Sequence, residues 1–352
     1  MPKPAKGLWP RVLEWDNLVL AAREASRNKR FHRDVLHFNF HLEENLLRIR
    51  ELLASGQWKP GQYKELWVYE PKQRLIHAPA FADRVVHHAL VQVIGPHFER
   101  RFMDCSYACR VGKGTHAASM ALQGMLMSAK ACWGRPYVLK GDISKYFYSI
   151  SHGILLKVIR RTIGDRDVLR LIDSLVTECS CIDGSVGLPL GALTSQLFAN
   201  VYLDQLDHFI KDELGVRHYV RYMDDFVVVH ESKESLWALL AQIRDFLATR
   251  LRLSLNPKTA VFPAGRGVDF AGYRHWATHA LPRKRNVRRA ARRFAGLSRV
   301  YARGRVSLDI VRSCVASFTG YMMRCKGWRS TESVLGRLVL VRPREEGKDE
   351  EH

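Results

Sequence analysis

Tyr222-Met223-Asp224-Asp225 is a polar tetrapeptide that lies between two short apolar runs, His218-Tyr219-Val220 and Phe226-Val227-Val228-Val229. Both runs have the composition of β-strands, so the sequence predicts a hairpin with the two acids at its tip. Adjacent carboxylates repel each other, and a hard divalent cation relieves that repulsion. A solvated turn is the alternative, because Asp is common in turns in any case.

A third acid ends another predicted strand. Tyr137-Val138-Leu139-Lys140-Gly141-Asp142-Ile143 is β-prone up to Asp142, and a helix N-cap is the plain alternative for a single Asp at this place. If this strand lies beside the hairpin in one sheet, the three carboxylates converge on a site for two Mg²⁺ ions, for which Mn²⁺ can substitute. Such a site suits template-directed nucleotidyl transfer.

The charge of the chain points to a polyanionic partner. The 352 residues include 56 Lys and Arg against 35 Asp and Glu, which gives a net charge of +21. Neutralising phosphates releases counterions, so nucleic acid is the expected partner, and a basic protein without one is the alternative. With 47% hydrophobic residues the chain is long enough for two or three subdomains.

Cysteine use and hydropathy predict a cytoplasmic protein with no membrane contact. The seven cysteines form no Cys-x-x-Cys pair, which favours a reducing compartment over a disulfide framework. No run approaches 18 apolar residues, and no hydrophobic region follows the basic N-terminus.

Pattern changes divide the rest of the chain. Helices are predicted up to about Gly56, followed by a basic hairpin over residues 63–80, a helix over residues 83–98 and a glycine-punctuated basic loop over residues 106–116. The loop over residues 187–196 leads into a long helix with Thr194 or Ser195 as its cap, and Ser232 caps a second amphipathic helix. Residues 253–259 read as a strand.

Residues 283–305 predict a helix with one apolar and one cationic face. Apolar residues keep helical spacing while basic residues crowd the remaining positions, and few acids are interleaved; the apolar ones are Val287, Ala291, Phe294, Leu297 and Val300. The excess of one sign favours contact with nucleic acid over a solvated face. The charged residues 341–352 are expected to be disordered.

Taken in order, these segments resemble the motifs of reverse transcriptases, in particular bacterial retron, group II intron and diversity-generating retroelement types. Lys140-Gly141-Asp142-Ile143 with Phe147 resembles motif A, residues 187–196 resemble motif B, and Tyr222 to Asp225 resembles motif C. Leu255 to Thr259 resembles motif D, and Phe270-Ala271-Gly272-Tyr273 resembles motif E. The resemblance covers roughly residues 15 to 320.

The resemblance implies an α+β right-hand polymerase, with fingers, a palm whose antiparallel sheet carries the catalytic aspartates, and a short helical thumb. The expected boundaries are an N-terminal helical segment over residues 1–60, fingers over 61–136, palm over 137–280, basic helical thumb over 281–340 and a tail over 341–352. The expected activity is RNA-directed DNA synthesis, with template RNA, cDNA and deoxynucleoside triphosphates as partners.

Roles carry over residue by residue. Asp142, Asp224 and Asp225 match the metal ligands, with the main-chain carbonyl of Ile143 completing a site. Phe147 matches the bulky gate that excludes a ribose 2′-hydroxyl, and Lys258 matches a motif D general acid, although a surface lysine is equally in keeping with its position. Further expected contacts with the incoming nucleotide are Lys72, Arg74, Leu190, Gly191 and Gln196. Expected contacts with nucleic acid are Arg110, Lys113, Tyr222, Met223, Arg285, Arg288, Arg289, Arg292 and Arg293.

Motif B departs from the common pattern. Many reverse transcriptases have Pro-Gln-Gly where this chain has Pro189-Leu190-Gly191, and Ser195-Gln196 resembles the signature of diversity-generating retroelement enzymes, which copy RNA with frequent errors at adenines. Error-prone synthesis is therefore one hypothesis.

Three alternatives stay open. A defence-associated reverse transcriptase working with its own noncoding RNA is one, because Gly320 to Trp328 differs from the ending of retroelement enzymes. A non-catalytic RNA-binding scaffold is another, against which the three intact acids argue. A group II intron maturase is less expected, because little chain follows the predicted thumb. An accessory subunit or an oligomer is compatible with each.

Overall fold

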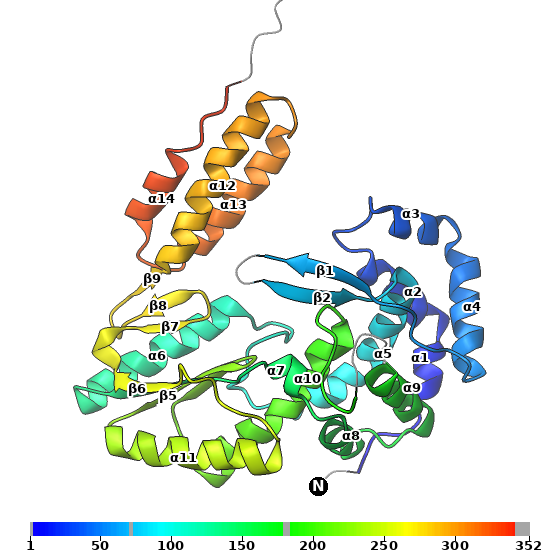
Figure 1. The fold of residues 1–352 in the computed structure, drawn as a ribbon, viewed down its shortest axis with the longest axis horizontal. Helices are drawn as coiled ribbons and strands as arrows, with labels where there is room; N and C mark the ends of the chain where they lie inside the picture. Colours follow the sequence, from blue (N-terminus) through cyan, green and yellow to red (C-terminus); the bar gives the residue numbers. More distant parts are fainter. Residues whose placement is uncertain (1–2, 70–72, 179–183, 342–352) are drawn as a thin grey trace, which may run out of the picture. The chain divides into compact units, whose positions relative to one another are not determined.

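The computed structural model describes residues 3–69, 73–178 and 184–341. The chain forms two compact units. Unit 1 comprises Met1–Gly114, Gly141–Phe226 and Trp237–Ala260, and unit 2 comprises Thr115–Lys140, Val227–Leu236 and Val261–His352. The mixture of helices and sheet fits the expected α+β class (Figure 1), whereas the finer fingers, palm and thumb boundaries stay predictions.

The first part of unit 1 is helical, as the apolar stripe predicts. Helix α2 packs along α5, and Leu18, Leu90 and Ile94 are fully buried in this region (Figure 1). The hairpin predicted for residues 63–80 is present, with Lys64 opposite Ala78. The elements are α1 (Trp9–Leu13), α2 (Trp15–Ala25), α3 (Arg33–Phe40), α4 (Leu42–Ala54), β1 (Lys64–Val68), β2 (Arg74–Ala78) and α5 (Phe81–Glu99).

The later part of unit 1 surrounds a long buried helix. Helix α10 (Leu193–His208) continues into a π-helical turn (Phe209–Glu213), and Phe198, Tyr202 and Leu206 on it are almost inaccessible. Asp165 caps α9 by accepting from the amides of Asp167 and Val168. The other helices are α7 (Tyr146–Ser149), α8 (His152–Arg160), α9 (Arg166–Thr177) and α11 (Lys233–Arg250).

A four-stranded sheet carries the predicted acids. Its strand order is β4-β5-β3-β6, so the strand that ends at Asp142 lies next to the second strand of the hairpin. This adjacency confirms the arrangement that the sequence predicted. The strands are β3 (Tyr137–Asp142), β4 (Tyr219–Tyr222), β5 (Asp225–His230) and β6 (Ala260–Pro263).

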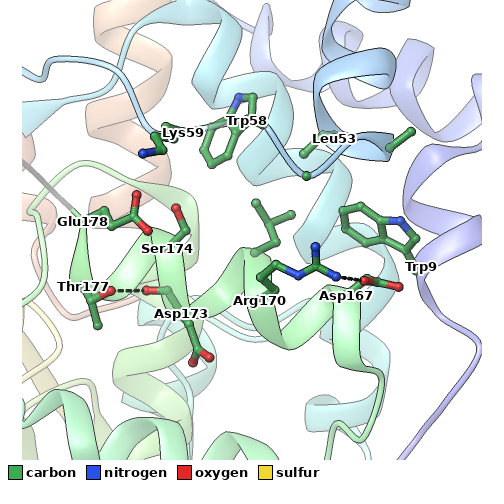
Figure 2. A pocket seen from close by; sticks show the side chains of 13 residues that line it. Trp9, Leu53, Trp58, Lys59, Asp167, Arg170, Asp173, Ser174, Thr177 and Glu178 are labelled. Carbon is green, nitrogen blue, oxygen red and sulfur yellow. Dashed lines mark hydrogen bonds and ion pairs between the residues drawn. The ribbon is translucent and has the colours of Figure 1, made fainter.

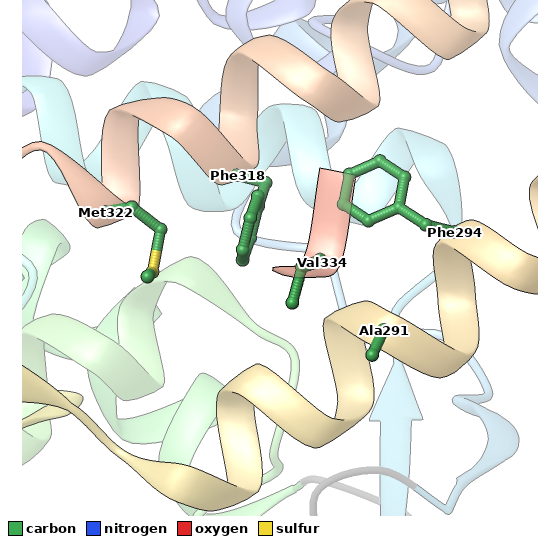
Figure 3. Packing of buried hydrophobic residues seen from close by; sticks show 5 residues of the cluster. All are labelled: Ala291, Phe294, Phe318, Met322 and Val334. Atoms are coloured by element: carbon green, nitrogen blue, oxygen red, sulfur yellow. The ribbon is translucent and has the colours of Figure 1, made fainter. Parts of the chain in front are cut away.

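Unit 2 combines a small antiparallel sheet with a three-helix bundle. Its strands pair in the order β7-β8-β9, and Gln123 of α6 donates to the carbonyl of Ala277. Apolar residues from three helices form the bundle's core, which includes Phe294 and Phe318 (Figure 3). The elements are α6 (Thr115–Trp133), β7 (Val268–Phe270), β8 (Tyr273–His275), β9 (Ala280–Pro282), α12 (Lys284–Ala302), α13 (Leu308–Met322) and α14 (Trp328–Leu335).

Two local predictions are wrong. Neither Thr194 nor Ser195 caps α10, since Ala192 occupies the cap position and the Thr194 hydroxyl lies 2.8 Å from Nδ1 of buried His87. Residues 253–259 form no strand: Leu255 makes an isolated bridge to Ile143, and Pro257 and Lys258 form a turn. The Asn256 side chain accepts from the Lys258 amide, and Pro257 lacks an amide hydrogen, so both residues favour the turn.

Two other local predictions are confirmed, the cap of α11 and the helix expected at residues 283–305. Ser232 caps α11 by accepting from the Ser235 amide at 3.0 Å. The expected helix at residues 283–305 is α12, and its apolar face, apart from the exposed Val300, packs in the bundle core. In the described part of the chain, no helix is both long and apolar enough to cross a membrane. The tail over residues 342–352 lies outside the described residues.

Candidate active site

Asp224 and Asp225 lie at the tip of the β4–β5 hairpin. A two-residue turn, Met223-Asp224, joins the strands, and Asp225 begins β5. Met223 has a φ of 56°, which is uncommon for a residue other than glycine and costs conformational energy. The turn therefore needs support from its surroundings.

The end of β3 is bonded directly to this turn. The Ile143 amide donates to the Asp224 carbonyl at 3.2 Å. A Cβ on Gly141 would lie only 2.1 Å from the Phe226 ring, so the residue before Asp142 has to be glycine for the ring to pack there. These contacts bring Asp142 into the neighbourhood of Asp224 and Asp225.

Asn256 is a site residue that the sequence did not reveal. Its amide donates to the Asp142 carbonyl at 2.7 Å, and its Nδ2 donates to Oδ2 of Asp142 at 3.0 Å. The side chain thus holds one orientation of the Asp142 carboxylate. Its only sequence signal is the Asn-Pro pair two residues before Lys258, which indicates a turn but no partner.

The loop over residues 187–196 lies against the β1–β2 hairpin and α7. The His77 amide of β2 donates to the Leu190 carbonyl at 2.8 Å, and the Leu188 amide donates to the Phe147 carbonyl at 2.8 Å. Gly191 has a φ of 121°, and a Cβ there would lie 2.9 Å from the His77 carbonyl oxygen. Glycine at position 191 therefore permits the close approach of β2 to this loop.

The predicted nucleotide contacts have different surroundings. Phe147 is half-buried beside the Tyr146 ring, whereas Arg74 at the start of β2 is exposed. Gln196 is half-buried on α10, and Lys258 is exposed at the turn that holds Asn256. Lys72 lies outside the described residues.

The two cations of the basic loop that were expected to contact nucleic acid, Arg110 and Lys113, have partners within the protein. Arg110 has a side chain that is only 4% exposed, and it binds Glu99 together with the carbonyls of Met103 and Ser106. Lys113 donates to Asp104 and lies over the Tyr107 ring. Internal contacts therefore occupy both cations, which gives them a structural role within this loop.

The cationic face of α12 is present in unit 2. All five of its predicted arginines are exposed, although the Arg293 side chain also reaches Sγ of Cys314 at 3.2 Å. The opposite face fills the bundle core, so the helix is amphipathic as predicted. The five are Arg285, Arg288, Arg289, Arg292 and Arg293.

The carboxylates at the end of β3 and at the β4–β5 hairpin tip have the chemistry of magnesium ligands. Asp142, Asp224 and Asp225 supply carboxylate oxygens, and Mg²⁺ prefers oxygen ligands. Within residues 3–69, 73–178 and 184–341, no three His, Cys, Asp or Glu side chains are grouped closely enough to hold a metal. The donor set fits the metal in kind, and the grouping of the three carboxylates stays a prediction.

A cavity of about 300 Å³ in unit 1 involves none of the predicted site residues. It lies between the end of α4 and helix α9, where Trp58, Lys59, Ser174 and Glu178 line it (Figure 2). Arg170 in its wall pairs with Asp167. Asp142, Asp224 and Asp225 are therefore not among the residues that line this cavity.

Comparisons with known proteins agree with the geometry. The family described as "Reverse transcriptase (RNA-dependent DNA polymerase)" matches residues 59–275, more than half of the chain. Protein YkfC of Escherichia coli is 27% identical over 267 residues, covering 64% of this chain and 70% of that protein.

More distant similarities extend to longer proteins. The group II intron-encoded protein LtrA of Lactococcus lactis is 22% identical over 302 residues, covering 66% of this chain. This chain spans 49% of LtrA. The apo telomerase structure from Candida tropicalis aligns with a TM-score of 0.48 at 11% identity, over 62% of this chain and 48% of that one. By the family match, the chain belongs to the reverse transcriptase family, and its catalytic domain is that of an RNA-directed DNA polymerase.

Proposed function

We propose that this protein synthesises DNA on a dedicated RNA template, with Asp142, Asp224 and Asp225 as the metal ligands of the catalytic site. The observation that carries the proposal is the hydrogen bond from the Ile143 amide to the Asp224 carbonyl, which joins the two acid-bearing segments. Bound Mg²⁺ ions would activate the primer hydroxyl and stabilise the leaving pyrophosphate.

The chain's own residues would orient the substrates. The Asn256 side chain orients the Asp142 carboxylate. The hydrogen bond between His77 and Leu190 joins the loop over residues 187–196 to the hairpin that carries the exposed Arg74. Arginine suits a triphosphate because its guanidinium makes bidentate phosphate contacts. Phe147, held at α7 by the Leu188 amide, would exclude the 2′-hydroxyl of a ribonucleotide.

Template binding would draw on the positive charge of the chain. The net charge is +21, and the arginines of α12 form an exposed cationic face. Phosphate neutralisation by such a face releases counterions and supplies affinity without sequence preference. Selection of one RNA then requires further contacts, which an accessory subunit could supply.

The protein isolated with its nucleic acid provides the test. The RNA that copurifies is sequenced, Mg²⁺ and four deoxynucleoside triphosphates are added, and the DNA product is sequenced. The proposal requires cDNA complementary to the bound RNA and no product from Asp224→Asn. A folded, RNA-loaded protein that makes no DNA would contradict it.

A template/variable repeat pair near the gene favours a retroelement role, whereas a phage-resistance phenotype that depends on the noncoding RNA favours defence.

Leu190 motivates a finer proposal, that synthesis is error-prone. An apolar side chain stands where many relatives have Gln beside the nascent base pair, so one polar contact to that pair is lost. Misincorporation opposite template adenine should exceed that of Leu190→Gln when both proteins copy the same RNA. Equal error rates in the two proteins would count against the role of Leu190.

A further inference from the structure

Arg221 is a fully buried cation immediately behind the catalytic turn. It precedes Tyr222 on β4, and its side chain has 0% exposure, as does its ion-pair partner Asp207 on α10. Burial opposes the charge, but the Asp207 carboxylate outweighs it and raises the pKa of Arg221 above its ordinary value. Arg221 therefore keeps its positive charge inside the protein.

All five N–H groups of the guanidinium have acceptors. Nε donates to Oδ1 of Asp207 at 2.7 Å, and Nη2 donates to Oδ2 of the same carboxylate and to Oγ of Ser106 at 2.9 Å. Nη1 donates to Oδ1 of Asn200 at 3.3 Å and to the Met223 carbonyl at 3.0 Å. One planar group thus joins α10, the segment at Ser106 and the turn.

The bond to Met223 is the informative one. Met223 has a left-handed backbone conformation, and its carbonyl belongs to the peptide that leads into Asp224. Four other hydrogen bonds hold the Arg221 guanidinium in place, so its bond to the Met223 carbonyl restrains that peptide. The main chain of Arg221 is also fixed, because its amide donates to the Cys105 carbonyl and its carbonyl accepts from the Tyr107 amide.

Stability alone does not account for this arrangement. Removing two charges from water is costly, and a buried ion pair is often no more stabilising than apolar residues of the same volume. What the pair does provide is geometry, since arginine offers five donors in a rigid plane and lysine offers three on a flexible chain.

We propose that Arg221 is a positioning residue that, anchored by Asp207, Asn200 and Ser106, holds the Met223 carbonyl and thereby sets the placement of Asp224 and Asp225. The expected effect of Arg221 on the rate rests on the proposed function, whereas its expected effect on the conformation of the turn does not. It assigns a role in synthesis to a side chain that touches no substrate.

Arg221→Lys keeps the buried charge and loses the bridge, so it is the test variant. We expect kcat for primer extension to fall roughly 10- to 100-fold, because small displacements of reacting groups cost that much. KM for the nucleotide should change by less than about threefold, since no substrate contact is removed. Hydrogen–deuterium exchange of the peptide over residues 219–226 should be faster in Arg221→Lys than in the wild-type protein. This measurement is made without substrate and does not depend on polymerase activity.

Tyr202→Phe is the matched control. It removes two other buried hydrogen bonds of α10, because the Tyr202 hydroxyl donates to the Leu251 carbonyl at 2.6 Å and accepts from the Ser151 amide at 3.4 Å. It should leave both kcat and exchange at the turn unchanged. If Arg221→Lys does not fold, Ser106→Ala removes one anchor of the guanidinium and should shift both measurements in the same direction by less.

The outcomes separate the two proposals. Arg221→Lys or Ser106→Ala with wild-type kcat and wild-type exchange at the turn would overturn the positioning role. A wild-type protein that fails to extend any primer would overturn the proposed function, while the exchange measurement would still decide whether Arg221 holds the turn.

Discussion

At the scale of single residues, sequence patterns indicated the proposed catalytic groups better than the groups that support them. Asp142, Asp224 and Asp225 follow from their places at strand ends. Arg221 and Asn256 do not, because their partners are distant in sequence: Ser106 is 115 residues from Arg221, and Asp142 is 114 from Asn256. Only the folded chain shows such pairings.

Gly141→Ala should damage both stability and activity. The new methyl group would overlap the Phe226 ring, and overpacking of this kind costs about 1–3 kcal/mol. The melting temperature and the rate of primer extension should both fall.

A smaller partner should relieve that overlap. The double variant Gly141→Ala with Phe226→Leu should regain part of the lost melting temperature, because leucine leaves room for the methyl group. A Gly141→Ala protein with wild-type stability and rate would show that the close packing of Gly141 on Phe226 is unimportant.

At the scale of elements, periodicity predicted most helices and the hairpins, and the two errors arose from burial in one case and from local hydrogen bonds in the other. Thr194 was expected to cap α10, but it lies within the core and bonds to His87 instead. Leu253, Ser254 and Leu255 alternate as in a strand, yet Asn256 forms local hydrogen bonds that favour a turn and compete with strand pairing.

The packing of α5 against α10 should weaken in acid. Burial lowers the pKa of His87 to about 3 from 6.5, so the unfolded chain takes up a proton below pH 6.5 while the folded protein does not. Stability should therefore be complete above pH 6.5 and fall as the pH decreases toward 3, by about 2 kcal/mol at pH 5 from this residue.

Thermal unfolding between pH 7 and pH 5 measures that contribution. His87→Gln should show a shallower loss of melting temperature than the wild-type protein, even if it starts lower. His32→Gln, at an exposed position, should keep the wild-type slope. Parallel slopes for His87→Gln and the wild type would refute the assignment.

The exposed face of α12 should dominate the salt dependence of RNA binding. Replacing Arg288 and Arg292 with Gln removes two exposed cations, so the slope of log K against log salt should become shallower by about 1.5. Filter binding or fluorescence anisotropy at several salt concentrations measures this slope.

A charge-matched control separates local contact from net charge. Arg27→Gln with Arg160→Gln removes the same charge from two surface ion pairs, Arg27 with Glu24 of α2 and Arg160 of α8 with Asp173 of α9. We expect that pair to leave the slope nearly unchanged. Equal effects of the two double variants would show that α12 has no special part in binding.

At the scale of the whole molecule, composition and motif order predicted the class of fold and the family. The excess of basic residues and the order of five motifs agree with the family match over residues 59–275. Domain boundaries were less accessible, because each compact unit is assembled from three separate segments of the chain. Contacts between distant segments define such units, and local sequence patterns do not predict those contacts.

The central claim is that the three acids perform RNA-directed DNA synthesis. The most direct measurement is single-turnover extension of a DNA primer on a defined RNA template, with Mg²⁺ and the four deoxynucleoside triphosphates. The wild-type protein should extend the primer, and Asp142→Asn and Asp224→Asn should each be slower by roughly 100-fold or more while binding the same RNA. Extension at the wild-type rate by either variant, or none by a folded wild-type protein bound to the template, would contradict the account.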